Sequence, residues 1–310
     1  MSSAVYNGER GYLEMLENVI KYGDKVDQKE ERTNTGTLSS LFQLLEFDLE
    51  DGFPLYITKK INFSNIIGEL LWMLSGNTSL MGLRKYQDKN YGAHTIWSDD
   101  FEKYGLATGQ GNCNQYGGRI YGKQWRNFNC LDLDGNPNTH DQLEELLMNM
   151  LRVNMGDPTM ARRLIMTAWN PYDHTVGDKK CTALPACHTD FQVIIRNGKL
   201  NLRFSMRSND LMLGNPYNVA FYAALVHILC AYFDLQPGKL ACFITDAHIY
   251  ANHIEGAKEQ ISRKYAIGIN NVKLEVPHFE NFADLFEMTA KDFKITGYNP
   301  MPFIKLPQAS

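Results

Sequence analysis

One apolar stretch constrains the fold of this chain more than any other feature of its sequence. Residues 219–233 are almost all apolar and include His227. A membrane-spanning helix needs about 20 apolar residues, so this stretch, about 15 residues long, is too short to cross a bilayer. It predicts a helix buried in a protein core. With 310 residues, 44% of them hydrophobic, the chain is long enough to bury such a helix in one compact domain.

The segments around this stretch predict strands and further helices. FQVIIR and KLNLRFSMR alternate apolar and polar residues and are joined by Asn197-Gly198, the strongest short signal for a β-hairpin. More strands are expected in LSSLFQLLEFD, RLIMTAW and KLACFIT, and helices over 12–22, 64–75 and 141–154. We therefore expect an α+β fold, a mixed sheet packed by helices. It forms a single domain over residues 1–310, with an irregular insertion at about 85–140.

Charge and cysteine usage exclude several classes of protein. The chain has 31 Lys and Arg against 35 Asp and Glu, a formal net charge of −4, which argues against a basic surface for polymeric nucleic acid or a membrane. Its six cysteines form no CxxC pair, as is typical of a reducing compartment. The N-terminus has no apolar secretory core, so we expect a cytoplasmic protein, and no metal site is predicted.

Two segments contain side chains suited to catalysis. Cys187 and His188 are adjacent, which suggests a nucleophile beside a base. Neighbouring strand residues point to opposite faces, however, and a buried structural cysteine is the alternative. Glu69 lies in the apolar segment IIGELLWML, where a carboxylate must be paired, hydrated or protonated. The alternative for Glu69 is an exposed position on an amphipathic helix.

Four arginines lie in polar or loop-edge segments: Arg32, Arg162, Arg163 and Arg207. A guanidinium can bind phosphate through two parallel hydrogen bonds, and Ser208 beside Arg207 would add a hydroxyl donor. For each arginine taken singly, solvation at the surface is the alternative.

Three further side chains fit a nucleotide site. His248 and Tyr250 alternate at the end of a predicted strand, so both can face one pocket, with core packing as the alternative. Asn218 lies just before the apolar stretch, where an N-cap is the simplest interpretation. Its amide, which has one acceptor and one donor end, also matches the edge of a uracil ring.

Ten segments together resemble the thymidylate synthase family, from about Tyr12 to the last residue. They are RTNTGT, DGFPLYITKK, ELLWMLSGNTS, IWSDDF, YGKQWR, ARRLIMTAWNP, LPACH, RSNDLMLGNPYN, DAHIYANH and FKITGYNPMPFIK. The resemblance implies a thymidylate synthase-like mixed sheet, a homodimer that associates sheet to sheet, and a C-terminal tail at about 300–310 that closes over the substrates. It also implies one-carbon transfer from 5,10-methylenetetrahydrofolate to C5 of dUMP, without a metal.

The same resemblance assigns roles to individual residues. The catalytic set is Cys187, Glu69, Tyr121, His188, Asp210 and Asn218. The dUMP-binding set is Arg32, Arg207, Ser208, Asn218, His248 and Tyr250, with Arg162 and Arg163 donated by the other subunit. The folate-binding set is Lys59, Ile96, Trp97, Asp210, Leu213, Gly214, Tyr217 and Ser310.

Within these sets, Cys187 is implied to add to C6 of dUMP, and Arg207 beside it would lower the pKa of the thiol. Glu69 is implied to organise water and shuttle protons around O4 and the folate, and Tyr121 with His188 to assist removal of the C5 proton. Relatives that act on dCMP carry Asp where this chain has Asn218, so we predict dUMP as the substrate.

Several positions depart from the family pattern and leave the product of the reaction open. Ala186 replaces Pro, Tyr217 replaces Phe and Thr245 replaces Gly; the chain ends at Ser310 instead of a small apolar pair, and residues 171–180 are an insertion. A wetter closed site would give a dUMP hydroxymethylase, which adds water to the methylene intermediate. An inactive nucleotide- or RNA-binding homologue is a further hypothesis. A Cys-His hydrolase is disfavoured by the adjacency of Cys187 and His188.

Overall fold

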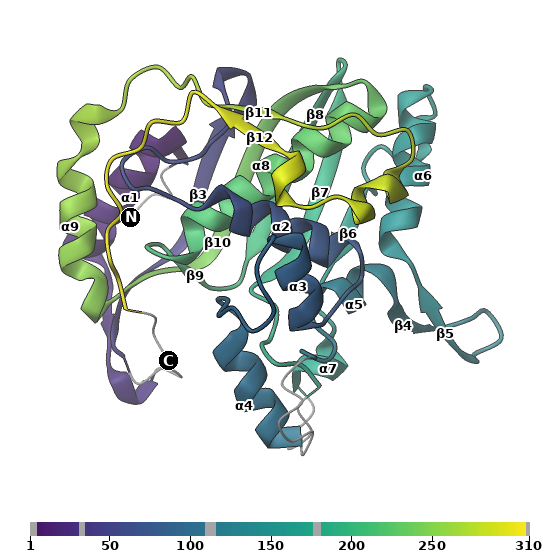
Figure 1. Cartoon of the computed structure of the whole chain (residues 1–310), viewed down its shortest axis with the longest axis horizontal. Helices are drawn as coiled ribbons and strands as arrows, with labels where there is room; N and C mark the ends of the chain where they lie inside the picture. Colours follow the sequence, from purple (N-terminus) through teal and green to yellow (C-terminus); the bar gives the residue numbers. More distant parts are fainter. Residues whose placement is uncertain (1–4, 31–34, 109–115, 176–180, 308–310) are drawn as a thin grey trace.

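The computed structural model describes residues 5–30, 35–108, 116–175 and 181–307. A large sheet forms one layer, and the helices of the core pack on one of its faces (Figure 1). Its strands are β1 (Val5–Asn7), β2 (Asp24–Val26), β3 (Thr37–Asp48), β6 (Ile165–Thr167), β7 (His188–Arg196), β8 (Lys199–Met206), β9 (Asn209–Asp210) and β10 (Gln236–Tyr250).

The sheet contains both kinds of strand pairing. Its order is β1-β3-β10-β8-β7-β6, with β2 on β3 and β9 on β10. Strand β10 runs antiparallel to β3 but parallel to β8 and β9, and β7 pairs antiparallel with β6 and β8. The predicted mixed sheet packed by helices is therefore confirmed.

The predicted hairpin joins β7 to β8. Asn197 and Gly198 both have a positive φ, of 54° and 72°, as a two-residue type I′ turn requires. Residues along both strands alternate between the buried core and the opposite face, so that Phe191 and Phe204 point inward as a facing pair. The period-two pattern of these strands therefore determines which face of the hairpin is buried.

Helix α8 (Gly214–Phe233) is the buried helix that the apolar stretch predicts, and it packs against α2 (Phe63–Leu74), β8 and β10. By length and composition it could cross a membrane, yet most of its residues are enclosed within the protein. Burial lowers the pKa of His227, whose Nδ1 lies 2.9 Å from the carbonyl oxygen of Ala223. The helix begins at Gly214, five residues before Val219, and this start accommodates Pro216 in the first turn, where a missing N–H is tolerated.

The remaining helices and strands surround this core. They are α1 (Gly8–Tyr22), α3 (Leu80–Tyr86), α4 (Ser98–Thr108), α5 (Tyr121–Arg126), β4 (Phe128–Leu131), β5 (Pro137–His140), α6 (Gln142–Asn154), α7 (Pro171–Thr175), α9 (Ile254–Ser262), β11 (Lys273–Glu275) and β12 (Lys294–Thr296). The segment 85–140 is thus more regular than predicted, since it contains α4, α5 and the β4–β5 hairpin, which projects beside α6 (Figure 1). Its aromatic residues Trp97, Phe101 and Tyr121 are buried, and this packing orders a segment whose composition is typical of loops.

The other face of the sheet exposes large apolar side chains. Leu41 and Phe42 on β3 are 52% and 68% exposed, and Phe243 on the neighbouring β10 is 46% exposed. Phe42 has φ of 57°, and the pairing of β3 with β10 is interrupted there without a change of register. A sheet face of this kind is suited to association with another protein surface.

Candidate active site

The thiol of Cys187 lies beside the guanidinium of Arg207. Cys187 comes directly before β7 and Arg207 directly after β8, its antiparallel neighbour, so the hairpin brings the two residues together. Nη2 of Arg207 is 3.6 Å from Sγ of Cys187, and its Nε donates to the carbonyl oxygen of Ala186 at 2.8 Å. A fixed cation at this distance stabilises a thiolate, the reactive form of cysteine.

Tyr121, the first residue of α5, positions the backbone of Cys187. Its hydroxyl accepts a hydrogen bond from the N–H of Cys187 at 2.7 Å, and its ring lies 4.9 Å, centroid to centroid, from that of His188. Burial raises the pKa of Tyr121, so the phenol stays protonated and keeps a hydrogen to donate. The hydroxyl can therefore hold a water or a substrate atom near the thiol.

His188 turns into the core, towards α8. Its Nε2 lies 3.0 Å from Nδ2 of Asn218 and its Nδ1 lies 3.3 Å from the hydroxyl of Tyr222. Burial lowers the pKa of His188 to about 4, so the ring is neutral at physiological pH. Because the amide nitrogen of Asn218 can only donate, Nε2 of His188 accepts and the ring proton resides on Nδ1.

Asn218 is not the N-cap of the helix, and that interpretation of the sequence is wrong. Helix α8 begins at Gly214, so Asn218 lies inside it and its side chain points to His188 and to Asn209, whose Nδ2 donates to Oδ1 of Asn218 at 2.9 Å. The N-cap is Leu213, and the turn just before it is held by Asp210, whose Oδ1 accepts from the N–H groups of Met212 and Leu213. Asn218 is half-buried, so the free positions of its amide remain accessible.

Glu69 on α2 accepts a hydrogen bond from the indole of Trp97, with Nε1 and Oε1 3.1 Å apart. Burial raises the pKa of Glu69 to about 7, against weaker opposing effects of the indole and of the charge on Lys89. The alternative of an exposed carboxylate is therefore wrong. A carboxyl group with a pKa near neutrality can both give and take a proton.

Lys59 lies at the start of α8, within the electrostatic influence of Asp210. Lys59 is buried, its Nζ donates to the carbonyl oxygen of Met212, and burial lowers its pKa to about 8 while the charge on Asp210 opposes this shift. Leu213 and Gly214 follow directly, so Lys59 and these two predicted folate residues lie around the same helix start.

His248 and Tyr250 lie on one face of β10, as the alternation predicts. Their rings are 5.1 Å apart, centroid to centroid, and His248 pairs with Asp210 of β9 in the sheet. Strand β9 thus places the end of β10 next to the helix start that carries Asp210. Most of the predicted site residues within the described part of the chain therefore converge on one region.

Comparison with known proteins decides the family. A model of the family described as "Thymidylate synthase" matches residues 10–310. A protein of Escherichia phage T5 named "Probable thymidylate synthase" is 37% identical over 303 residues, which cover 96% of this chain and 99% of that protein. The chain belongs to the thymidylate synthase family. The resemblance found in the ten segments is thus confirmed over nearly the whole chain.

Two arginines that the family resemblance assigns to the phosphate lie far from Cys187. Arg162 and Arg163 are exposed and precede β6, and Leu164, the next residue, accepts from the N–H of Val193 on β7. Six residues of extended strand separate Val193 from Cys187, a distance of about 20 Å. These arginines do not reach the Cys187 site of their own chain.

Four other predicted site residues add little to the geometry of the site. Arg32 and Ser310 lie outside the described residues. Ser208 is half-buried next to Arg207, whereas Ile96 is 53% exposed beside the buried Trp97.

The departures from the thymidylate synthase pattern have distinct structural settings. The hydroxyl of Tyr217 accepts from the N–H of Asn62, the N-cap of α2, so the extra oxygen relative to Phe ties α8 to the helix that carries Glu69. Ala186 is buried and its carbonyl oxygen accepts from Arg207. Thr245 is an exposed residue within β10, beside the interruption at Phe42.

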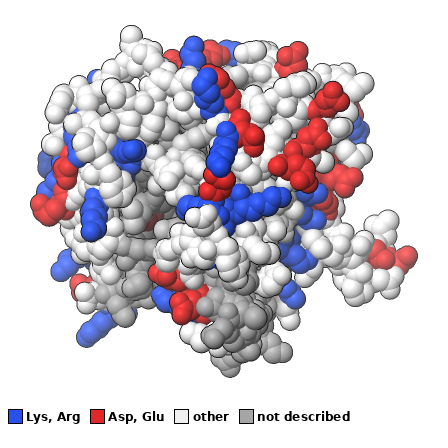
Figure 2. Space-filling view, in the orientation of Figure 1, with Lys and Arg blue, Asp and Glu red and all other residues white. Residues whose placement is uncertain are grey.

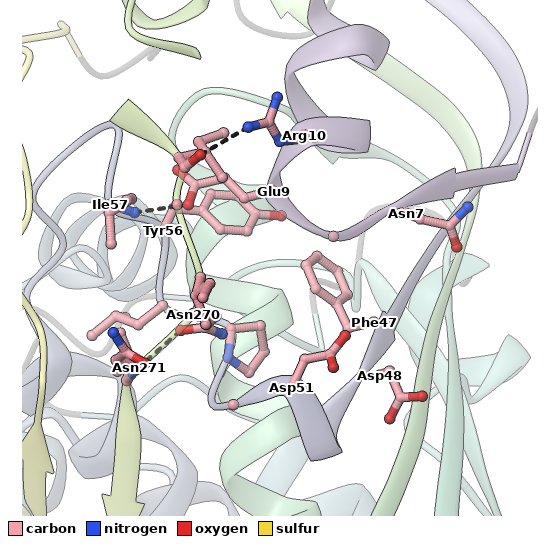
Figure 3. A pocket seen from close by; sticks show the side chains of 18 of the residues that line it. Asn7, Glu9, Arg10, Phe47, Asp48, Asp51, Tyr56, Ile57, Asn270 and Asn271 are labelled. Carbon is pink, nitrogen blue, oxygen red and sulfur yellow. Dashed lines mark hydrogen bonds between the residues drawn. The ribbon is translucent and has the colours of Figure 1, made fainter. Parts of the chain in front are cut away.

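The backbone just before Lys59 is held from several directions. The carboxylate of Glu9 on α1 accepts from the N–H groups of Ile57 and Thr58 at 2.9 and 2.8 Å, and Figure 3 shows Glu9 pointing to Ile57 at one side of a separate pocket. Arg263, which follows α9, donates to the carbonyl oxygen of Thr58 at 2.8 Å, and the N–H of Met301 donates to that of Ile57 at 2.7 Å. Both ends of the chain therefore fix the position of Lys59.

The predicted closing tail begins along α9. Nε2 of His253 lies 2.6 Å from the carbonyl oxygen of Pro307, and Arg263 donates to that of Pro302 at 2.7 Å. Gly256 faces Leu306 so closely that an added Cβ would lie 2.5 Å from its Cδ2. The described part of the tail is thus packed on α9.

Sequence reasoning missed a group of polar residues behind the site. Tyr56, Asn209, Asn215 and Tyr222 are all buried and hydrogen-bonded, and two of them flank the apolar residues of RSNDLMLGNPYN. Two asparagines within the core-forming part of a chain are a signal for such a network, because a buried amide must be hydrogen-bonded.

Proposed function

We propose that this protein is a thymidylate synthase that converts dUMP and 5,10-methylenetetrahydrofolate into dTMP and dihydrofolate. Membership of the family and the phage relative support an enzyme that modifies C5 of dUMP. The observation that carries the proposal is the half-buried thiol of Cys187, 3.6 Å from the guanidinium of Arg207 and with its backbone held by Tyr121.

In this mechanism the thiolate of Cys187 forms a bond to C6 of the uracil ring, and the displaced electron pair makes C5 nucleophilic. Asn218 binds the O4/N3 edge, and Glu69, with its pKa near 7, exchanges protons at O4 through water. C5 would then bond to the one-carbon unit of the folate, and the C5 proton leaves towards the network of Tyr121 and His188 as the rest of the folate departs. A hydride from the folate would complete the methyl group, and the electron pair that this displaces expels the Cys187 thiolate from C6, which restores the ring and regenerates the enzyme.

The residues proposed for folate fit an aromatic, anionic ligand. Trp97 supplies an indole fixed by its hydrogen bond to Glu69, and Lys59 supplies a buried cation at the start of α8. When bound, the folate supplies the one-carbon unit and then a hydride. Leu213, Gly214 and Tyr217 border the same helix start, and the tail packed on α9 would exclude water from it.

Phosphate binding is proposed to need two subunits. Arg207 and Ser208 lie at the Cys187 site, whereas Arg162 and Arg163 lie about 20 Å away along β7. The exposed apolar sheet face with Leu41, Phe42 and Phe243 offers a surface on which a second copy can pack. A sheet-to-sheet homodimer would bring the partner's arginines to the phosphate.

The proposal needs neither a membrane nor polymeric nucleic acid, and a cytoplasmic location remains our prediction. On the face seen in Figure 2, basic and acidic side chains are interspersed, which fits the formal charge of −4. Among the described residues, no cluster of three or more His, Cys, Asp or Glu could hold a metal ion. The absence of a metal from the reaction remains a prediction.

Product analysis tests the proposal. The protein is incubated with dUMP and methylenetetrahydrofolate. The mass of the nucleotide product is measured by mass spectrometry, and the formation of dihydrofolate is followed by its near-ultraviolet absorbance. We expect dTMP and dihydrofolate in equal amounts, and no product from Cys187→Ser. A product heavier by one oxygen, with tetrahydrofolate released, would instead establish a dUMP hydroxymethylase, and no turnover by the native chain would favour an inactive homologue.

A further inference from the structure

A chain of buried hydrogen bonds leads from the core to Asn218. The hydroxyl of Tyr56 donates to Oδ1 of Asn215 at 3.1 Å, and Nδ2 of Asn215 donates to Oδ1 of Asn209 at 2.8 Å. Nδ2 of Asn209 then donates to Oδ1 of Asn218 at 2.9 Å. Tyr56, Asn209 and Asn215 are each no more than 2% exposed, so water does not compete for these contacts.

The chain has a direction, because each amide has one accepting and one donating end. In the direction found here, Oδ1 of Asn218 faces Asn209 and Nδ2 of Asn218 faces His188. The opposite direction would require all three amides to turn together, the proton of His188 to move to Nε2, and the hydroxyl of Tyr56 to accept from Asn215 instead of donating to it. The orientation of Asn218 is therefore coupled to those of Asn209 and Asn215, two residues that lie behind it.

The two directions would present different edges to a pyrimidine. On the proposed function, His188 lies on the side of C5, so the amide end beside His188 meets the substituent on C4 and the end beside Asn209 meets N3. With Nδ2 beside His188, Asn218 donates to O4 and accepts from N3–H, which matches uracil. In the reversed direction it would accept from N4–H₂ and donate to N3, which matches cytosine.

We propose that Asn209 and Asn215 are positioning residues that set the base specificity of the site by fixing the amide of Asn218 in the uracil-binding orientation. This proposal rests on the proposed function for the placement of the pyrimidine. Neither residue is assigned to the base, and the coupling acts through Asn218.

Asn209→Asp tests the proposal, because aspartate has nearly the same shape but only accepts. The carboxylate would accept from Asn215 as before and would require Asn218 to turn its Nδ2 inward, and two donors directed at it favour its ionised form. We expect the ratio of dissociation constants, dCMP over dUMP, to fall by roughly tenfold or more, from the reversal of two hydrogen bonds to the base. The ratio cancels any general effect of the new charge on nucleotide binding.

We predict the same change for Asn215→Asp, which alters the chain of hydrogen bonds one residue further from Asn218. Its carboxylate would turn Asn209, which would turn Asn218, so the ratio should again fall by roughly tenfold. This variant keeps the proposal testable if Asn209→Asp does not fold, as judged by its melting transition. Asn149→Asp is the matched control, since Asn149 is a buried asparagine on α6, outside the chain of hydrogen bonds, and its ratio should not change.

Calorimetric binding of dUMP and dCMP at mildly alkaline pH measures these ratios without turnover. If native protein binds dUMP but forms no dTMP, the proposed function fails while the inference can still be decided. A ratio unchanged within about twofold in folded Asn209→Asp and Asn215→Asp would overturn the inference, and so would an equal fall in Asn149→Asp.

Discussion

At the scale of single residues, burial gives three side chains of this site protonation properties that they would not have in water. The pKa of Glu69 rises to about 7, that of His188 falls to about 4 and that of Lys59 falls to about 8. All three shifts favour the neutral form, because a low-dielectric surrounding disfavours charge. Glu69 therefore changes charge near neutral pH and Lys59 slightly above it, whereas His188 stays neutral.

Glu69→Gln should stabilise the protein at alkaline pH while abolishing turnover. The folded pKa of about 7 lies above the ordinary value of 4.5, so the folded state binds more protons and native stability falls as pH rises from 4.5 through 7. Gln keeps an acceptor for Trp97 but carries no charge. The free energy of unfolding of the variant, relative to the native chain, should rise by up to about 3 kcal/mol between about pH 5 and about pH 8.

Denaturant titrations of both proteins across this pH range measure the difference. Glu275→Gln, a change at a carboxylate that the structure pairs at the surface with Lys294, is the control and should show little pH-dependent difference. A gap between Glu69→Gln and native protein that stays constant with pH would show that Glu69 is not buried as a neutral acid.

At the scale of elements, the Asn197-Gly198 turn sets the register in which Cys187 meets Arg207. Both turn residues have a positive φ, which glycine adopts freely and asparagine tolerates, whereas a β-branched residue does not. The turn lies at the opposite end of β7 and β8 from the thiol. Strain introduced there should weaken the fold without changing the chemistry of the site.

Gly198→Val should lower the free energy of unfolding by about 1–2 kcal/mol, the cost of a left-handed conformation for an L-residue. Asn197→Gly is the paired control and should change it by no more than about 0.5 kcal/mol, since glycine adopts the same φ. Urea unfolding and turnover of each variant are measured together. A loss of kcat in Gly198→Val without any loss of stability would contradict this separation of turn and site.

Elements with a strong local signal could be predicted from the sequence, and elements that depend on distant packing could not. The hairpin and the buried helix follow from alternation, a turn dipeptide and apolar length. The start of α8 was missed because Gly214, Asn215 and Pro216 resemble a turn, and only the core around Asn215 and Asp210 shows that they begin a helix. The contact of Asn218 with His188 could not be predicted for the same reason, since the two residues lie 30 positions apart in the chain.

At the scale of the whole molecule, the proposed phosphate site is incomplete in one chain. Arg162 and Arg163 are exposed on the β6 side of the sheet, far from Arg207. If the partner subunit supplies them, two differently damaged chains should complement each other. Cys187→Ser lacks the nucleophile, whereas the double variant Arg162→Ala, Arg163→Ala lacks only the donated arginines.

Mixing these two inactive proteins after dissociation and reassociation should restore up to about a quarter of native activity. Half of the dimers would then be mixed, and each mixed dimer would hold one intact site of two. Mixing Cys187→Ser with a chain that carries all three substitutions is the control and should stay inactive. Activity that fails to recover in the first mixture, although mixed dimers form, would place the arginines outside the shared site.

The hydrogen bonds that hold the backbone of residues 57 and 58 also affect when the protein can become active during its synthesis. Glu9 is translated long before Met301, yet both hydrogen-bond to the backbone beside Lys59. A nascent chain that does not yet extend to Met301 lacks the second of these contacts. Lys59 therefore reaches its final position only after Met301 has been made and has folded back, so a chain cut short before Met301 should accumulate as a folded core without a complete folate site.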